Sequence, residues 1–360
     1  MSQRFVGVMQ DIVDVLRTTY AAETVAVVPG GGTYAMEAVA RQLATGRRCL
    51  VVRNGLFSYR WSQIIDTGSV TDHTTVCSAR PVSGERQAPW APAPVEEVVE
   101  AIERHRPEVV FAAHVETAAG IVLPDDYVRA LATATHHAGG LLVLDCIASG
   151  SLWVDMTELG VDVLLSAPQK GWSGSPGAGY VMLSEAGRAQ VMSTTSTSFA
   201  VDLQKWLTIT EAYTRGQTPY HATMPTDTLA HDAALMLETR AAGLGELRLA
   251  QTSLGARVRA LLAELGFPSV AAEGFAAPSV VVAFTDDPEI RSGAKLKERG
   301  LQVAAGVPLM CGEGDDFSTF RVGLFGLVSR FSQNVRWSRN QRWINARGAS
   351  GAAPRFRRHR

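Results

Sequence analysis

The chain has 360 residues, of which 46% are hydrophobic and 19% charged, and its formal net charge is −1. This length exceeds what one hydrophobic core usually serves, so two domains are expected. The composition is typical of a cytoplasmic globular enzyme and excludes a disordered chain. No apolar run approaches the roughly 18–20 residues that a membrane-spanning helix needs, and the acid-containing N-terminus is not a secretory signal.

The basic residues gather at the C-terminal end of the chain, whereas the cysteines are scattered along it. Residues 328–360 hold nine Arg and no Asp or Glu. Such a basic tail could bind nucleic acid, but it carries no repeat or recognisable motif, so nucleic-acid binding is not expected. Four scattered cysteines lack metal-ligand spacing and indicate reduced thiols in a cytoplasm: Cys49, Cys77, Cys146 and Cys311.

The first half of the chain alternates short β-branched runs with helical periods. Strands are predicted at 24–28, 48–53, 69–77, 107–115, 140–145, 161–167 and 179–184, and helices at 33–44, 57–66, 95–105 and 125–138. Repeated strand–helix–strand units predict an α/β fold with a mostly parallel sheet flanked by helices. Ligands of such sheets bind beyond the carboxyl ends of the strands.

The second half predicts a smaller α+β unit. Residues 201–265 are largely helical in pattern, and strands at 279–284 and 319–324 enclose a helix around 287–299. We therefore expect a large domain over 1–245, a small C-terminal domain over 246–327 and a basic atypical tail over 328–360.

Four strand-end features carry candidate chemistry. The loop PGGGT at 29–33 can cradle a phosphate or simply form a tight turn. Asp145 ends a strand and can pair with a cationic ring nitrogen or a metal, or cap the next segment. Lys170 follows a core strand and can attack carbonyls or face solvent. Arg321 lies in a late strand and can bind a carboxylate or form an internal salt bridge.

Together these parts match the protein side of a pyridoxal-phosphate site. The chain resembles class V, fold-type I aminotransferases, especially the alanine/serine–glyoxylate (serine–pyruvate) group. The resemblance covers residues 3 to about 327. It rests on the ordered set GGGTYAMEA (30–38), RNGLFSYRW (53–61), AHVETAAGI (113–121), LLVLDCIAS (141–149), SAPQKGW (166–172), PYHATMPT (219–226) and FRVGLFG (320–326).

The resemblance implies how the cofactor is held. Its phosphate would be bound by Gly31, Gly32, Thr33 and Gln169. Its ring would be contacted by four further residues: Phe57 would stack on it, Thr117 would reach the ring hydroxyl, Asp145 would bind the protonated ring nitrogen, and Ile147 would pack against it.

The resemblance also implies the reaction and the assembly. Lys170 would form the internal aldimine, a Schiff base, and its freed amine would move the proton from the substrate Cα. Arg321 would bind the substrate carboxylate. Tyr220 and Thr223 would reach the phosphate of the other subunit in a homodimer with shared active sites. The substrates would be a small amino acid such as alanine or serine and an oxo acid, glyoxylate or pyruvate.

Three alternatives stay open at this stage. One is a 2-aminoethylphosphonate–pyruvate transaminase. Another is a lyase similar to cysteine desulfurases, which share the fold and use a mobile cysteine before a comparable Arg; Cys311 would be that residue. A third is an inactive homologue, because relatives start earlier and end in an acidic amphipathic helix that the basic tail does not match. His114 is as readily a packing residue as a site residue.

Overall fold

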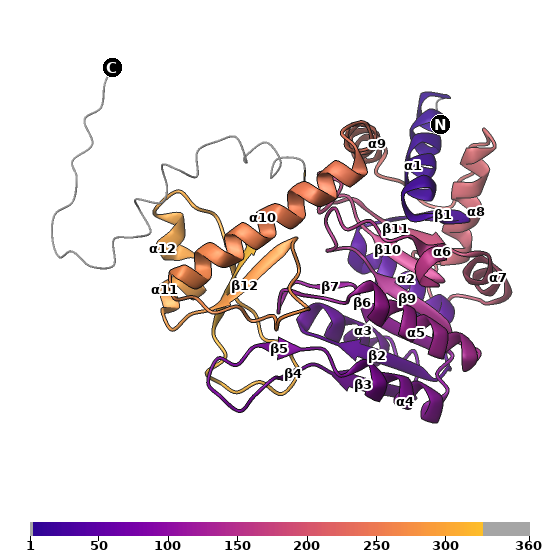
Figure 1. The fold of residues 1–360 in the computed structure, drawn as a ribbon. Coiled ribbons are helices and arrows are strands. Elements are labelled where there is room, and N and C mark those ends of the chain that lie inside the picture. Colours follow the sequence, from indigo (N-terminus) through magenta and orange to yellow (C-terminus); the bar gives the residue numbers. More distant parts are fainter. Residues whose placement is uncertain (1–2, 327–360) are drawn as a thin grey trace, which may run out of the picture.

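The computed structural model describes residues 3–326, and Figure 1 shows their arrangement. The helices are α1 (Gln3–Tyr20), α2 (Gly32–Leu43), α3 (Leu56–Thr67), α4 (Val95–His105), α5 (Asp125–His137), α6 (Met156–Leu159), α7 (Glu185–Ser193), α8 (Leu203–Thr214), α9 (Thr226–Ala241), α10 (Leu244–Glu264), α11 (Pro288–Arg291) and α12 (Ala294–Lys297).

A seven-stranded sheet forms the centre of the molecule. Its order is β1 (Thr24–Pro29), β11 (Ala178–Leu183), β10 (Val163–Ser166), β9 (Leu141–Asp145), β6 (Val109–Ala113), β2 (Cys49–Arg53) and β3 (Thr74–Ser78). Only β11 runs antiparallel to its neighbours, β1 and β10. The seven strands that the sequence predicted in the first half all belong to this sheet, and the predicted α/β fold is confirmed.

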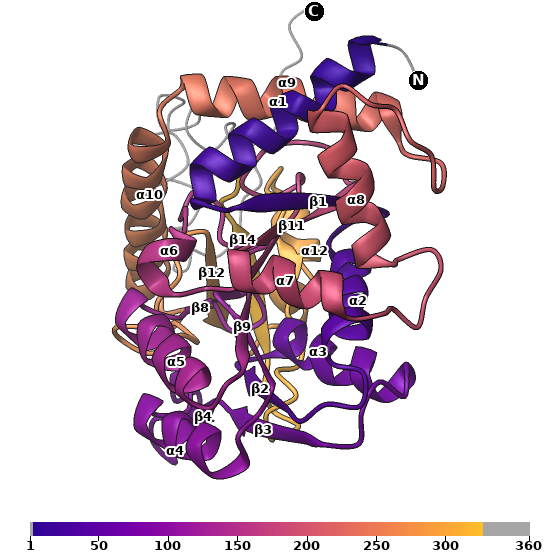
Figure 2. The same ribbon diagram turned by 90° about the vertical axis from the view of Figure 1, so that its right-hand side faces the viewer.

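Helices cover both faces of this sheet. In Figure 2, α4 and α5 lie on one side of β2 and β9, and α2 and α3 lie on the other. Strands β6, β10 and β11 are buried throughout, because their mostly apolar side chains are removed from water on both faces of the sheet. Polar functional residues are therefore expected in the loops and helix ends that follow the carboxyl ends of the strands.

A smaller sheet follows in the chain. It has the order β12 (Val280–Phe284), β14 (Thr319–Gly323) and β13 (Ala304–Ala305), and α10 packs against β12. Two short ribbons, β4 (Arg80–Pro81) with β5 (Trp90–Ala91) and β7 (Val115–Glu116) with β8 (Ile121–Val122), complete the strands.

The single helix predicted around 287–299 is wrong. The segment forms two short helices, α11 and α12, which are separated at Ser292 and Gly293. Gly293 has φ 80°, a left-handed conformation that ends a right-handed helix and that glycine adopts without a Cβ penalty.

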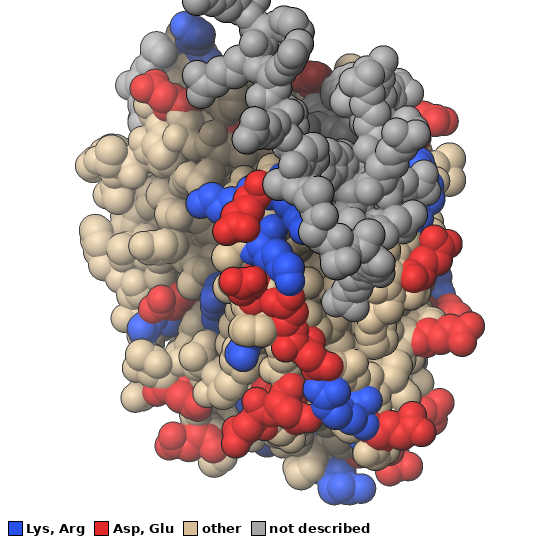
Figure 3. Space-filling view, turned by 90° about the vertical axis from the view of Figure 1, so that its left-hand side faces the viewer, with Lys and Arg blue, Asp and Glu red and all other residues tan. Residues whose placement is uncertain are grey.

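The two-domain division stays a prediction. One hydrophobic cluster joins residues of both halves, for example Val115 and Ile121 with Val280 and Val282. The predicted basic tail, 328–360, lies outside the described residues. Over residues 3–326, no helix combines the length and apolarity needed to cross a membrane. On the part of the surface that Figure 3 colours, basic and acidic side chains are interspersed.

Candidate active site

The predicted site residues follow strands that end at one edge of the central sheet. Asp145 ends β9, Glu116 and Thr117 follow β6, and Lys170 follows β10. These strands are parallel, so their carboxyl ends meet at the same edge. The glycine loop after β1 joins them, because β1 and β10 both run antiparallel to β11.

The glycine loop leads directly into α2. Gly30 and Gly31 have φ 115° and 128°, which only glycine adopts readily. A Cβ on Gly32 would lie 2.7 Å from Cδ1 of Ile147, so the loop approaches the segment after β9 closely. No side chain caps α2 at Gly31, and the first N–H groups of a helix have no partner within it. This loop therefore has the form of an anion cradle.

Arg60 joins this cradle, although the sequence analysis did not single it out. Its Nη1 donates a hydrogen bond of 3.1 Å to Oγ1 of Thr33, and its Cζ lies 5.3 Å from the centre of the Phe57 ring. The guanidinium thus adds a positive charge beside the start of α2. The motif RNGLFSYRW contained the residue, but nothing in its spacing showed that α3 would bring it to Thr33.

Asp145 is buried, with 7% of its surface exposed. Its Oδ1 accepts a hydrogen bond of 2.9 Å from the backbone N–H of Ile147. Burial raises the pKa of the Asp145 carboxyl to about 7; the Ile147 hydrogen bond lowers it, nearby Glu116 raises it and Arg60 lowers it. A carboxylate in such a place gains strongly from a cationic partner.

Lys170 lies in the loop between β10 and β11. Burial lowers the pKa of its amine, and the nearby Arg321 guanidinium lowers it further. Its Nζ lies 4.8 Å from the centre of the Phe325 ring. A desolvated amine beside another cation is more often neutral and is then a nucleophile.

Arg321 reaches the same region from β14. Its Nε donates a hydrogen bond of 2.8 Å to the carbonyl oxygen of Ala305, and its Cζ lies 5.7 Å from the centre of the Phe57 ring. Burial lowers the pKa of the Arg321 guanidinium, and Glu116 raises it. The structure thus brings Lys170, Phe57 and Arg321 together.

Glu116 is a fully buried acid whose importance the sequence analysis missed. Its Oε2 accepts bonds of 2.8 Å from both the backbone N–H and Oγ of Ser58. Its Oε1 accepts from the N–H groups of Ala118, at 2.9 Å, and Phe57, at 3.3 Å. Burial raises the pKa of Glu116 while these bonds oppose the rise. The carboxylate therefore fixes the start of α3, which carries Phe57. Thr117, the next residue after Glu116, is itself buried.

The remaining predicted residues are half-buried or exposed. Gln169 has a buried Oε1 without a hydrogen-bond partner among the described residues. Ile147 is half-buried beside Gly32. Tyr220 and Thr223 lie in the loop between α8 and α9 and are exposed, Tyr220 by 75%. The single chain leaves this pair at the surface.

His114 and Cys311 lie in surroundings that favour packing over reactivity. The Nδ1 of buried His114 lies 2.7 Å from Oγ of Ser149, and burial lowers the pKa of the imidazole to about 4. Cys311 lies with its Sγ 3.5 Å from the carbonyl oxygen of Arg53, and burial raises the pKa of its thiol to about 12. A reactive cysteine requires the opposite change.

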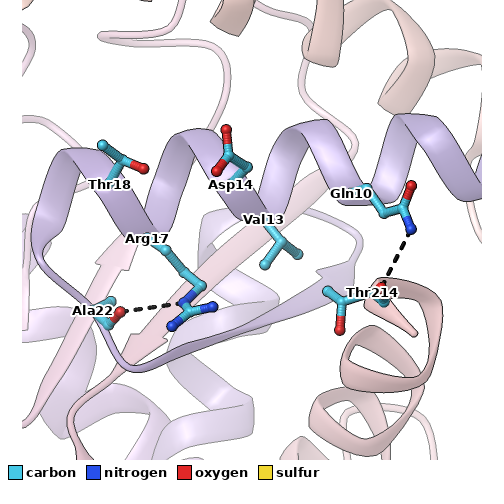
Figure 4. A pocket seen from close by; sticks show the side chains of 7 residues that line it. All are labelled: Gln10, Val13, Asp14, Arg17, Thr18, Ala22 and Thr214. Carbon is cyan, nitrogen blue, oxygen red and sulfur yellow. Dashed lines mark hydrogen bonds between the residues drawn. The ribbon is translucent and has the colours of Figure 1, made fainter. Parts of the chain in front are cut away.

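A separate surface cavity of about 500 Å³ lies beside α1, and none of the predicted site residues lines it (Figure 4). Gln10 reaches from α1 to the carbonyl oxygen of Thr214 on α8, and Arg17 to that of Ala22. The residues that line this cavity therefore connect α1 to neighbouring segments, and none of them belongs to the candidate active site.

The sheet-edge residues fit pyridoxal phosphate. The glycine cradle suits the phosphate, and the buried Asp145 carboxyl suits a protonated ring nitrogen. Gln169, whose amide nitrogen can donate to a phosphate oxygen, directly precedes Lys170 in the chain. No group of three or more His, Cys, Asp or Glu side chains within residues 3–326 could hold a metal ion.

A family model and two named relatives agree with this fit. The aminotransferase class-V family model matches residues 2–308. An L-aspartate–glyoxylate aminotransferase of Paracoccus denitrificans is 34% identical over 48% of this chain and 42% of its own. A 2-aminoethylphosphonate–pyruvate transaminase of Salmonella schwarzengrund is 27% identical over 90% of this chain and 85% of its own.

The fold also matches a solved aminotransferase structure. The crystal structure of an alanine–glyoxylate aminotransferase from Nostoc sp. matches with a TM-score of 0.79 at 22% identity, covering 95% of this chain and 88% of the other. The resemblance to fold-type I aminotransferases is thereby confirmed. The chain belongs to the class-V aminotransferases, pyridoxal-phosphate enzymes that transfer an amino group between an amino acid and an oxo acid.

Proposed function

We propose that this enzyme transfers the amino group of a small amino acid, such as alanine or serine, to glyoxylate or pyruvate. The observation that carries the proposal is that the desolvated Lys170 amine lies near the Arg321 guanidinium, at the same edge of the central sheet as Asp145. An amine, a carboxylate-binding fork and a buried acid are the groups that this reaction needs from the protein.

The chain's own residues then have distinct tasks. Lys170 would hold the cofactor through its side-chain amine, and that amine would take up and return the proton of the substrate Cα. Arg321 binds the α-carboxylate and so fixes which substrate bond faces Lys170. Asp145 holds the proton on the ring nitrogen. Pyridoxal phosphate, when bound, supplies the electron sink for the carbanion that proton removal creates.

A second set of residues positions the cofactor. Gly31, Gly32, Thr33 and Gln169 bind its phosphate, and Phe57, Thr117 and Ile147 hold its ring. Glu116 supports this set by fixing the start of α3, from which Phe57 projects. Of these residues Gly31, Gly32 and Thr117 are buried, whereas Thr33 is exposed.

A homodimer completes the site in this proposal. Tyr220 and Thr223 lie in an exposed loop, and an aromatic side chain that is 75% exposed gains by burial against a second subunit. There they would contact the phosphate held by the partner subunit. We place the enzyme in the cytoplasm.

A 2-aminoethylphosphonate–pyruvate transaminase is the second candidate. The Salmonella relative with that name matches 90% of the chain. Arg60, beside the cofactor cradle, and Arg321 are two guanidinium groups that could meet a phosphonate. The desulfurase alternative is less favoured, because the Cys311 thiol is buried and its pKa is raised.

The first test asks whether Lys170 holds the cofactor, and it measures the absorption spectrum of the purified protein. Addition of pyridoxal phosphate should produce a visible band that borohydride removes, and mass spectrometry should then place the reduced adduct on Lys170. Lys170→Ala should abolish that adduct, whereas Lys205→Ala, which alters an exposed lysine of α8, should not. Absence of a band in the parent would support the inactive homologue.

The donor is identified next. Alanine, serine and 2-aminoethylphosphonate are each added without an acceptor, and formation of pyridoxamine phosphate is measured. Conversion by alanine or serine, lost in Arg321→Met, would support the proposal. Conversion by the phosphonate alone would favour the second candidate, and conversion by none would refute transamination of these donors.

A further inference from the structure

Asp232 is a buried acid on α9, and none of the roles proposed above uses it. Only 1% of its surface is exposed. Its Oδ1 accepts a hydrogen bond of 2.8 Å from the backbone N–H of Ser175, and its Oδ2 accepts one of 3.4 Å from the hydroxyl of Tyr180. A carboxylate is rarely buried without such partners. The first of these bonds ties α9 to the connection that leads from Lys170 to β11.

The bond to Ser175 lies at the end of the turn that carries Lys170. The backbone N–H of Gly174 donates a hydrogen bond of 2.8 Å to the carbonyl oxygen of Pro168, which closes the chain around the lysine. The next N–H along the chain is that of Ser175, which Asp232 accepts. One buried carboxylate therefore fixes the chain where the lysine turn ends.

The same connection reaches the glycine cradle three positions later. The backbone N–H of Gly30 donates a hydrogen bond of 2.8 Å to the carbonyl oxygen of Gly177. Gly30 opens the loop that is proposed to bind the cofactor phosphate. Residues 174–177 thus join the Lys170 turn at one end to the phosphate cradle at the other.

This segment, residues 174–177, lies directly on one face of α9. A Cβ on Gly174 would lie 2.4 Å from Oδ1 of Asp232, and a Cβ on Gly177 would lie 2.6 Å from Cγ2 of Thr228. Thr228 and Asp232 are four positions apart, so they share one face of the helix. The two glycines therefore let the backbone approach α9 more closely than larger residues would.

We propose that Asp232 is a positioning residue, which fixes segment 174–177 on α9 and thereby sets the separation between the Lys170 amine and the glycine cradle. The phosphate and the aldehyde of pyridoxal phosphate are carried by one ring, so the two protein groups must lie at a matching separation. The inference rests on the proposed role of Lys170. It extends that role to a side chain that acts through the backbone of Ser175.

The test measures how the full chain binds pyridoxal phosphate. The apoprotein is titrated with the cofactor, Kd is taken from the visible band, and borohydride with mass spectrometry measures the adduct on Lys170. Asp232→Ala should raise Kd about tenfold, as expected for the loss of a hydrogen bond to a charged group. Asp232→Asn keeps an oxygen for the Ser175 N–H and should stay within about threefold of the parent. Glu238→Ala, at an exposed position of α9, should leave Kd unchanged.

A pair of size changes keeps the test decisive if Asp232→Ala does not fold. The three atoms nearest to a Cβ on Gly177 all belong to Thr228, at 2.6, 3.2 and 3.5 Å. Gly177→Ala should therefore lift the segment from α9 and raise Kd about tenfold. Adding Thr228→Ala removes the atom at 2.6 Å and should recover most of that loss, while Asp232 is unchanged in both proteins.

The outcomes separate this inference from the proposed function. A parent that is trapped on Lys170, with Asp232→Ala binding the cofactor equally well, would overturn the inference and leave the role of Lys170 intact. Equal losses in Asp232→Ala and Asp232→Asn would also overturn it, as would a loss in Gly177→Ala that Thr228→Ala does not relieve. A parent that binds the cofactor without an adduct on Lys170 would refute the proposed role of the lysine and the inference with it.

Discussion

The protonation of Asp145 should make the apoprotein lose stability as the pH rises. The pKa of this carboxyl is raised from its ordinary value of 3.8 to about 7 in the folded chain, mainly by burial. Between these values the unfolded chain is ionised and the folded chain holds the proton, so the free energy of unfolding falls with increasing pH. At about 1.4 kcal/mol per pH unit, the cost is about 2 kcal/mol at pH 5 and about 4 kcal/mol at pH 8.

Asp145→Asn removes this dependence. The asparagine keeps an oxygen for the Ile147 N–H, and any constant cost of the buried amide is the same at each pH. Urea unfolding of both apoproteins at pH 5 and pH 8 should therefore show the difference between them shifting by about 2–3 kcal/mol in favour of the variant. Parallel pH profiles would refute the argument that burial keeps this carboxyl neutral.

Cofactor binding should reverse the order of the two proteins at pH 8. A protonated ring nitrogen facing Asp145 stabilises the carboxylate and gives the parent a larger gain from pyridoxal phosphate than the variant. If pyridoxal phosphate raises the free energy of unfolding of both proteins equally, Asp145 does not contact the ring nitrogen. This conclusion does not depend on the result for the apoproteins.

Three other changes test the scaffold around the site. Glu116→Ala leaves two buried backbone N–H groups and one part-buried N–H group without an acceptor, and it should lower the free energy of unfolding in urea by about 3–5 kcal/mol. Glu103→Ala, at an exposed position, should change that free energy by less than about 0.5 kcal/mol, and equal effects would contradict the capping role. Gly32→Ala places a Cβ 2.7 Å from a side-chain carbon of the segment after β9 and should weaken pyridoxal phosphate binding about tenfold, whereas Gly7→Ala, with open space around it, should not. Iodoacetamide at pH 8 should alkylate Cys311 about a hundredfold more slowly than a free cysteine, because burial raises the pKa of its thiol to about 12 and the higher nucleophilicity of the thiolate offsets only part of the loss. Rapid alkylation with loss of activity would instead support the desulfurase alternative.

The sheet was predictable because its strands are short β-branched runs that end in turn residues. Residues 140–145 and 161–167, for example, are apolar at almost every position, as strands covered on both faces are. The order of the strands and the reversal of β11 were not predictable, because both depend on how helices pack between strands distant in sequence. The helix at 287–299 was wrong because its apolar periodicity masked the left-handed position at Gly293.

The site was predictable where a residue type is unusual for its position. A lysine or an aspartate at the end of a core strand stands out in one sequence, and so do three consecutive glycines before a helix. Glu116 and Arg60 gave no such signal. Their roles come from contacts with Ser58 and Thr33, 58 and 27 positions away in the chain, which only the packing of α3 establishes.

The reversal of β11 has a consequence for the order in which the site assembles during folding. Lys170 lies in a connection between two neighbouring antiparallel strands, β10 and β11, so its loop closes through local contacts. The loops that carry Gly32, Thr117 and Asp145 meet only after parallel crossovers have placed β6 and β9 and after β1 has paired with β11. Such long-range pairing is slow. We expect a nascent chain to present the lysine before the pocket for the phosphate and ring exists, so capture of the cofactor should be a late event that reports completion of the whole sheet.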